Sequence, residues 1–317
     1  MFAICLESSH QKGMGHLFRM LNFIEILRKE QQKFIFLINQ DLKTKKILEN
    51  KDIYYEVVDL YDYTSNWESL IVKKYNVEYW INDRLNTDKK HTENVLQNKC
   101  KLITFDDLGS GAKQSDINIC GLFFNKKSLT GKKILKGIDY LILNPEIDLY
   151  KKLREKLNNI LVTFGGSDTY GITIKILKIL KKNAIKATIH IGPSFEHIDE
   201  LNHELTNDYK IINYIPSLIK EFSNYDLAIT GAGITPFEAN ASGLPCLIVS
   251  SEVHELDNGK YLDSLKSSLY LGHRDKINNN LSSIIQSLNI PKMSEVGLNK
   301  LNVNAAKNIY KYIRDLK

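Results

Sequence analysis

Residues 8–19, SSHQKGMGHLFR, combine a glycine turn with a histidine in a pattern that could do acid–base chemistry. Gly13 and Gly15 let the backbone turn tightly and leave room for a ligand. His16 stands at the start of an expected helix, where it could take a proton from water at neutral pH while the helix N–H groups hold a diphosphate. The spacing is not the G-x-G-x-x-G of dinucleotide sites, so NAD is not indicated. A plain turn with a capping histidine is the alternative.

Two further glycine turns follow apolar runs in the second half of the chain. Gly165, Gly166 and Ser167 precede Asp168 in a turn that can hold phosphate or simply cap a helix. Glu238 falls about one and a half turns into the helix that the later turn opens, where it could accept hydrogen bonds from both hydroxyls of a ribose. The alternative for this carboxylate is a surface position near the helix dipole. The later turn itself comprises Gly231, Ala232, Gly233, Ile234 and Thr235.

Polar side chains also follow other expected strands. Asp83 comes after residues 79–81, and Asp106 and Asp107 come after residues 102–105. Because parallel strands end at one edge of a sheet, these acids could orient His16 or hold sugar hydroxyls, or they could merely cap turns. Residues 254–258, HELDN, should line the same region and include Asn258. Their spacing is weak for a metal site, so no metal and no cofactor are expected.

Short apolar runs alternate with amphipathic stretches throughout, which predicts two Rossmann-like α/β domains whose parallel sheets face a central cleft. The expected strands are residues 2–6, 34–38, 56–60, 79–81, 102–105, 140–143, 160–164, 187–191, 210–213, 227–230 and 245–249. The expected domains are residues 1–146 and 147–317, with a linker at residues 144–158. A last helix at residues 293–314 could pack back on the N-terminal domain.

The composition, 43% hydrophobic and 25% charged, is ordinary for a folded protein. The net charge of +6 comes from dispersed lysines, and no basic block is interleaved with aromatics, so nucleic-acid binding is not expected. No apolar run is long enough to span a membrane or form a signal peptide, which predicts a cytoplasmic protein. The four cysteines form no C-x-x-C pair and read as buried, reduced thiols. Nothing in the sequence indicates an oligomeric state.

Taken in order, the motifs resemble the GT-B group of nucleotide-sugar enzymes. The likeness is greatest to the UDP-sugar hydrolases of pseudaminic acid biosynthesis, the PseG and SpsG-like family. The resemblance covers most of the chain. It rests on residues 8–19, F-D-D at 105–107, F-G-G-S-D at 164–168, T-G-A-G-I-T-P-F-E-A at 230–239, G-L-P at 243–245, Glu255 and Asn258.

The resemblance implies metal-independent hydrolysis at the anomeric carbon of a UDP-linked deoxy-diacetamido sugar, in nonulosonic acid or surface-glycan biosynthesis. His16 would be the catalytic residue, and Tyr214 and Ile215 would lie beside the uracil. The nucleotide would bind the two later glycine turns and Glu238. The sugar side would comprise Gly13, Gly15, Arg19, Asp83, Asp106, Asp107 and Asn258.

The resemblance leaves two alternatives open. The lipid II N-acetylglucosaminyltransferase is similar in fold, so a glycosyltransferase that uses a UDP- or CMP-sugar is the alternative enzyme. A non-catalytic nucleotide-sugar sensor is a third possibility. The chain also departs from the family, which often carries a D-H-Y-like segment where this sequence has Asn82, Asp83 and Arg84. This departure bears on the identity of the sugar.

Overall fold

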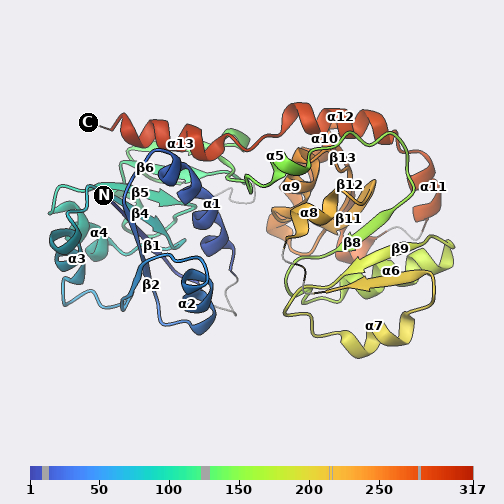
Figure 1. The fold of residues 1–317 in the computed structure, drawn as a ribbon, viewed down its shortest axis with the longest axis horizontal. Helices are drawn as coiled ribbons and strands as arrows, with labels where there is room; N and C mark the ends of the chain where they lie inside the picture. The colour runs from blue at the N-terminus through green and yellow to red at the C-terminus, as the bar shows by residue number, and fades with distance from the viewer. Residues whose placement is uncertain (9–13, 123–128, 214, 216, 278–279, 317) are drawn as a thin grey trace. The chain divides into compact units, whose positions relative to one another are not determined.

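The computed structural model describes residues 1–8, 14–122, 129–213, 215, 217–277 and 280–316. Gly13 and Tyr214, both expected to contact substrate, lie outside these residues. The chain forms two compact units (Figure 1). The first unit comprises Met1–Ile142 together with Asn304–Lys317, and the second comprises Leu143–Val303.

The first unit is built on a parallel sheet of seven described strands, in the order β3-β2-β1-β4-β5-β6-β7. The register places Leu6, the last residue of β1, opposite both Ile38 and Asp83. The strands are β1 (Phe2–Leu6), β2 (Phe34–Ile38), β3 (Tyr55–Val57), β4 (Tyr79–Asp83), β5 (Lys101–Phe105), β6 (Ile117–Cys120) and β7 (Lys133–Lys136). The main helices between them are α1 (Gly15–Lys29), α2 (Leu42–Glu49), α3 (Trp67–Tyr75) and α4 (Lys89–Leu96).

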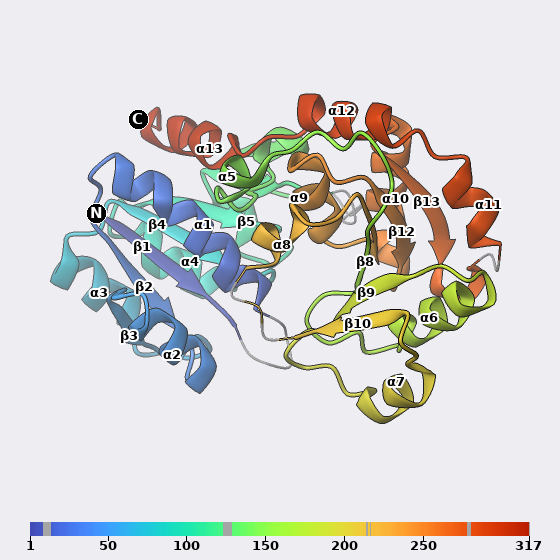
Figure 2. The ribbon, with the colours of Figure 1, turned by 45° about the vertical axis from the view of Figure 1, so that its right-hand side comes forward.

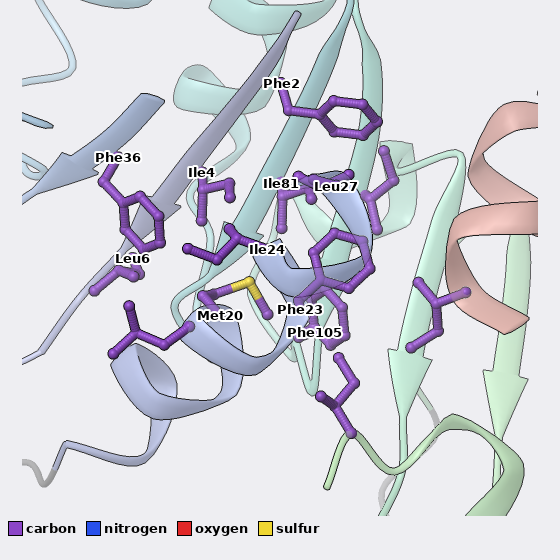
Figure 3. Close-up of a cluster of buried hydrophobic side chains, with 14 of the residues drawn as sticks. Phe2, Ile4, Leu6, Met20, Phe23, Ile24, Leu27, Phe36, Ile81 and Phe105 are labelled. Carbon is purple, nitrogen blue, oxygen red and sulfur yellow. The ribbon is translucent and has the colours of Figure 1, made fainter. Parts of the chain in front are cut away.

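Helix α1 packs its apolar face against this sheet (Figure 3). Leu17, Met20, Ile24 and Leu27 recur at helical spacing and are fully buried, in one cluster with Phe2 of β1. Burial of each such side chain is worth about 1.5–3 kcal/mol. The packing therefore fixes α1, and with it the residues of its first turn, relative to the ends of the strands.

The second unit contains a parallel sheet of six described strands, in the order β10-β9-β8-β11-β12-β13. Figure 2 shows β8, β9 and β10 side by side. The strands are β8 (Ile160–Thr163), β9 (Ala187–His190), β10 (Tyr209–Ile212), β11 (Leu227–Gly231), β12 (Cys246–Ser250) and β13 (Ser268–His273). The helices are α5 (Ile147–Tyr150), α6 (Ile172–Lys182), α7 (Ile198–Glu204), α8 (Leu218–Phe222), α9 (Thr235–Ala241), α10 (Leu256–Leu265), α11 (Leu281–Gln286) and α12 (Ile290–Lys300).

The C-terminal helical stretch is divided, contrary to the expectation of one helix at residues 293–314. Helix α12 ends at Lys300, Leu301 is extended, and α13 (Ala305–Arg314) begins four residues later. The break lets the two helices serve different cores, because α12 belongs to the second unit and α13 to the first. Ile309 and Ile313 of α13 are fully buried in the same cluster as Phe2.

The expected linker at residues 144–158 was also wrong, since this segment belongs to the second unit. Arg154 is only 1% exposed and donates hydrogen bonds to the carbonyl oxygens of Lys152, Phe222, Tyr225 and Ser242. Burial of a charged side chain is tolerated only with such partners. The guanidinium thereby ties the ends of α8 and α9 to the start of the unit.

Two further predictions about strands need correction. Residues 140–143 are apolar and Leu141–Leu143 are buried, but they form no strand. Instead they pack against the residue that directly follows β6, because an added Cβ at Gly121 would lie 2.6 Å from the Cα of Leu141. Strands β6, β7 and β13 were not anticipated. All four cysteines are free and buried, as expected.

Candidate active site

His16 and Asp83 are brought together at the carboxyl end of β4. His16 lies in the first turn of α1, and its Nδ1 is 2.6 Å from Oδ1 of Asp83, the last residue of β4. An ionised carboxylate can only accept hydrogen bonds, so Nδ1 carries the proton. The neutral ring therefore presents Nε2 as its basic nitrogen, the tautomer that a general base requires.

Arg19, one turn further along α1, joins Asp83 to a second carboxylate. Its Nε donates to Oδ2 of Asp83 at 2.9 Å, and its Nη2 donates to Oδ1 of the same residue. Nη1 donates to Oδ2 of Asp106, and the guanidinium lies 5.2 Å from the ring centroid of Phe105. One arginine thus fixes both acids, each of which follows or ends a strand.

The charges of this cluster reinforce one another. Asp83 is fully buried, and burial would raise the pKa of its carboxyl, but Arg19 and His16 together lower that pKa below its ordinary value. For Arg19, burial acts to lower the pKa, and the charges of Asp83 and Asp106 raise it above its ordinary value. Asp83 therefore stays ionised near neutral pH, where it holds the His16 tautomer and stabilises the imidazolium that proton uptake would form.

Asp106 keeps one oxygen available. It is 4% exposed and adopts a left-handed backbone conformation with φ of 50°, which is uncommon outside glycine. Its Oδ2 is held by Arg19, whereas its Oδ1 has no hydrogen-bond partner among the described residues. A buried acceptor without a partner is costly, so a hydroxyl or N–H donor of a ligand would be favoured there.

The other predicted sugar-side residues differ in role. Asp107 is fully buried, and its Oδ1 accepts hydrogen bonds from the backbone N–H groups of Thr87 and Gly109, so it organises the loops after β4 and β5. Gly15 is exposed, and a Cβ added there would meet nothing within 4 Å. The start of α1 has no side-chain cap among the described residues.

In the second unit, the turn after β11 is supported from behind. Gly231 ends β11, and Ala232 is fully buried, with its carbonyl oxygen accepting a hydrogen bond of 2.9 Å from Nδ2 of Asn258. Asn258, predicted to contact the sugar, thus holds this turn. Gly233 and Ile234 follow, and Thr235 begins α9, whose second residue is Pro236, a residue favoured in a first helical turn.

Glu238 lies in the first turns of α9 and is half-buried. Burial raises the pKa of its carboxyl to about 7, although a hydrogen bond from the backbone N–H of Asn144, 3.4 Å from Oε1, acts in the opposite direction. A carboxyl that burial has partly deprived of water gains from a donor that replaces this water. The hydroxyls of a ribose are donors of that kind.

The turn after β8 is organised mainly by Asp168. Its carboxylate accepts hydrogen bonds from the N–H groups of Ile172 and Thr173 at 2.9 and 2.7 Å, so the start of α6 is already capped. Of the two interpretations of this motif, helix capping therefore accounts for Asp168. Gly165, Gly166 and Ser167 precede it, and a Cβ added to either glycine would meet nothing within 4 Å. Ile215, in the loop between β10 and α8, is half-buried.

Sequence reasoning missed the interactions that hold the segment after β1. Ser8 is buried, and its hydroxyl pairs with that of Thr44 while its backbone N–H donates to Oδ1 of Asn39 at 3.0 Å. Asn39 follows β2 and Thr44 lies on α2. The polar residues at 39–44, just beyond a strand end, were the available signal.

Two results concern the described residues as a whole. They contain no group of three or more histidine, cysteine and acidic side chains that could hold a metal ion. None of their helices is long and apolar enough to cross a membrane.

No known protein-family profile matches the chain. Two curated relatives do. The chain is 31% identical over 291 residues to an uncharacterized protein of Methanocaldococcus jannaschii, covering 83% of the chain but only 58% of that relative's length. It is 25% identical over 289 residues to the spore coat polysaccharide biosynthesis protein SpsG of Bacillus subtilis, covering 85% of the chain and 83% of SpsG.

Solved structures establish the fold class. MurG of Acinetobacter baumannii matches with a TM-score of 0.71 and 13% identity over 99% of both chains. HepE of Anabaena, solved in complex with UDP, matches with a TM-score of 0.70 and 14% identity over the whole of both chains. The protein is therefore a GT-B-like α/β protein with two Rossmann-like domains, and it is similar in sequence to SpsG.

Proposed function

We propose that this protein is a nucleotide-sugar hydrolase. It would cleave the anomeric C–O bond of a UDP-linked deoxy-diacetamido sugar, releasing UDP and the free sugar, in surface-glycan or nonulosonic acid biosynthesis. The observation that carries the proposal is the 2.6 Å contact between His16 and Asp83, which leaves Nε2 of His16 as a base. The second unit would hold the nucleotide. The relatives support this assignment, because SpsG is named for polysaccharide biosynthesis and HepE was solved with UDP bound.

In the proposed reaction, Nε2 of His16 takes a proton from water as the water oxygen bonds to the anomeric carbon. The C–O bond to the diphosphate breaks, and its electron pair leaves with UDP. Asp83, kept ionised by Arg19, stabilises the imidazolium as it forms. Oδ1 of Asp106 would accept a hydrogen bond from a donor group of the sugar.

The second unit would bind and stabilise UDP. Glu238 would accept hydrogen bonds from the ribose hydroxyls, and the N–H groups around Gly231 and Gly233, with those of Gly165–Ser167, would face the diphosphate. Preorganised donors of this kind stabilise charge that develops on a leaving group. The uracil would lie beside Tyr214 and Ile215.

Nucleotide release without an acceptor tests the proposal. The purified chain would be incubated with UDP- and CMP-linked sugars, among them UDP-linked diacetamido-trideoxyhexoses, with no alcohol or lipid present. A hydrolase releases nucleotide at full rate under these conditions. Release that begins only when an acceptor is added would make the protein a glycosyltransferase, in which His16 deprotonates the acceptor hydroxyl. Tight UDP binding without turnover of any donor would indicate a sensor.

A further inference from the structure

Three residues form a cluster at the carboxyl edge of the second sheet that the proposed mechanism does not use. Tyr170 lies in the turn after β8, Glu252 follows β12, and Arg274 follows β13. The guanidinium carbon of Arg274 lies 3.4 Å from the ring centroid of Tyr170. The Tyr170 hydroxyl donates to Oε1 of Glu252, and Nη1 of Arg274 is 3.9 Å from the same oxygen. We call this group the Tyr170–Arg274–Glu252 cluster.

The strand order locates the cluster. Strands β8 and β12 are not neighbours, because β11 lies between them. Contacts that join the turn after β8 to the ends of β12 and β13 therefore pass over the carboxyl end of β11, where the Gly231 turn begins. The close surroundings of Gly231 agree, since a Cβ added there would lie 3.7 Å from Phe164, after β8, and 4.0 Å from the hydroxyl of Ser251, after β12.

Arg274 is anchored beside this turn. Its Nη1 donates to the carbonyl oxygen of Ser251, the residue whose side chain flanks Gly231. The side chain of Arg274 remains 20% exposed and that of Glu252 42% exposed, so solvent and solutes reach both. A pair this open is worth little by itself and can exchange partners.

A negative charge beside the Gly231 turn would have to be balanced by a positive one when an anion binds there. Glu255 also borders the turn, because a Cβ at Gly233 would lie 3.9 Å from its Oε1. Its Oε2 is occupied by the backbone N–H groups of Ser251 and Glu252. A diphosphate placed at this turn would therefore meet the negative charge of Glu255. Arginine matches phosphate oxygens with paired N–H groups, and Arg274 is positioned to balance that charge.

We propose that Arg274 is a diphosphate-binding residue. In the unliganded protein Tyr170 and Glu252 hold its guanidinium over the Gly231 turn, and on binding a phosphate oxygen of the nucleotide replaces the carboxylate of Glu252. The inference rests on the proposed function to the extent that the ligand is a nucleoside diphosphate. It adds a specific residue that supplies the positive charge for that ligand.

Calorimetry on the full chain with UDP, and competitive displacement with uridine, test the proposal. Arg274→Gln should weaken UDP binding by about ten- to a hundredfold, the worth of one charged hydrogen-bonding group, and leave uridine affinity unchanged. Lys276→Gln is the matched control. Lys276 is exposed and lies in the same short helical turn as Arg274, Arg274–Lys276, so its loss removes one positive charge nearby and should change UDP affinity less than threefold. Glu252→Gln should strengthen UDP binding severalfold, because it removes one of the two carboxylates, Glu252 and Asp275, that pair with Arg274.

Four outcomes would overturn the inference. Unchanged UDP affinity in Arg274→Gln, or an equal loss for UDP and uridine, would assign Arg274 a structural role only. An equal loss in Lys276→Gln would reduce the effect to general surface charge. Glu252→Gln weakening UDP as much as Arg274→Gln does would exclude the exchange of partners. If the parent chain fails to bind UDP at all, the proposed function itself is overturned, a result distinct from UDP binding that ignores Arg274.

Discussion

Nδ1 of His16 and Oδ1 of Asp83 lie 2.6 Å apart although 67 positions separate the two residues in sequence. The contact exists because β1 and β4 pair in parallel, with Leu6 opposite Asp83, and α1 starts shortly after β1. Sheet register therefore determines which nitrogen of His16 is basic. His16 and Asp83 should therefore act as a pair in catalysis, whereas Glu238 and Arg274 of the second unit should act in nucleotide binding.

Asp83→Asn should lower turnover by at least about a hundredfold, because an amide does not stabilise the imidazolium as a carboxylate does. His16→Asn should lower it by a similar or larger factor while UDP affinity changes less than threefold. The double variant should be little slower than His16→Asn alone, since the two residues act as a unit. Steady-state rates and calorimetric UDP affinities for the three variants provide the measurement. Independent, multiplicative losses would separate Asp83 from the base.

Glu238 should make nucleotide binding depend on pH. Burial raises the pKa of its carboxyl to about 7, and ribose hydroxyls require the ionised form as acceptor, so UDP affinity should fall as the pH is lowered through 7. The terminal phosphate of UDP also titrates near pH 6, so Glu238→Gln is the control. That variant should bind UDP more weakly at pH 8 and lose the part of the pH dependence near 7.

The stability of the same variant distinguishes lost binding from lost folding. A carboxyl whose pKa is raised in the folded state binds its proton more tightly there, so its ionisation above pH 7 disfavours the folded state. Glu238→Gln should therefore unfold at the same or a higher urea concentration than the parent at pH 8. Unchanged UDP affinity in a stable Glu238→Gln variant would exclude the ribose role.

Activity should survive EDTA. The proposed scheme assigns the diphosphate charge to backbone N–H groups and to Arg274, so no cation has to be supplied. Nucleotide release would be followed with and without chelator, and again after addition of magnesium or manganese. Loss on chelation with recovery on adding metal would contradict the scheme.

The sequence predicted most strands because buried parallel strands appear as short apolar runs, and the glycine turns mark where they end. Strand β6 was not predicted because the polar residue Asn118 interrupts its apolar pattern. Asn118 is nevertheless fully buried, and its side chain donates hydrogen bonds to the carbonyl oxygens of Asp107 and Thr130. Strand β7 was not predicted because Lys133 and Lys136 make its sequence resemble that of a surface loop. Edge strands often carry such charges.

The sequence predicted which residues form the candidate site, but not which of them are hydrogen-bonded to one another. Strand ends identified the acids, because parallel strands deliver their last residues to one edge. The sequence could not tell that Arg19 would bridge Asp83 and Asp106, since these partners lie 64 and 87 positions away. Nor could it predict that the Asp107 carboxylate would accept hydrogen bonds from backbone N–H groups of the loops. Such assignments depend on side-chain directions that only the packed fold defines.

The position of attack provides the last prediction. If His16 delivers water to the anomeric carbon, a reaction run in ¹⁸O-water should place the label on the anomeric hydroxyl of the released sugar and leave the UDP phosphate unlabelled. The reason is that the scheme breaks the bond between carbon and oxygen, so both phosphates keep their original oxygens. Mass spectrometry of the sugar and of UDP reads out both positions at once. The label in UDP would mean attack at phosphorus, and the basic nitrogen that Asp83 leaves on His16 would then serve a different chemistry.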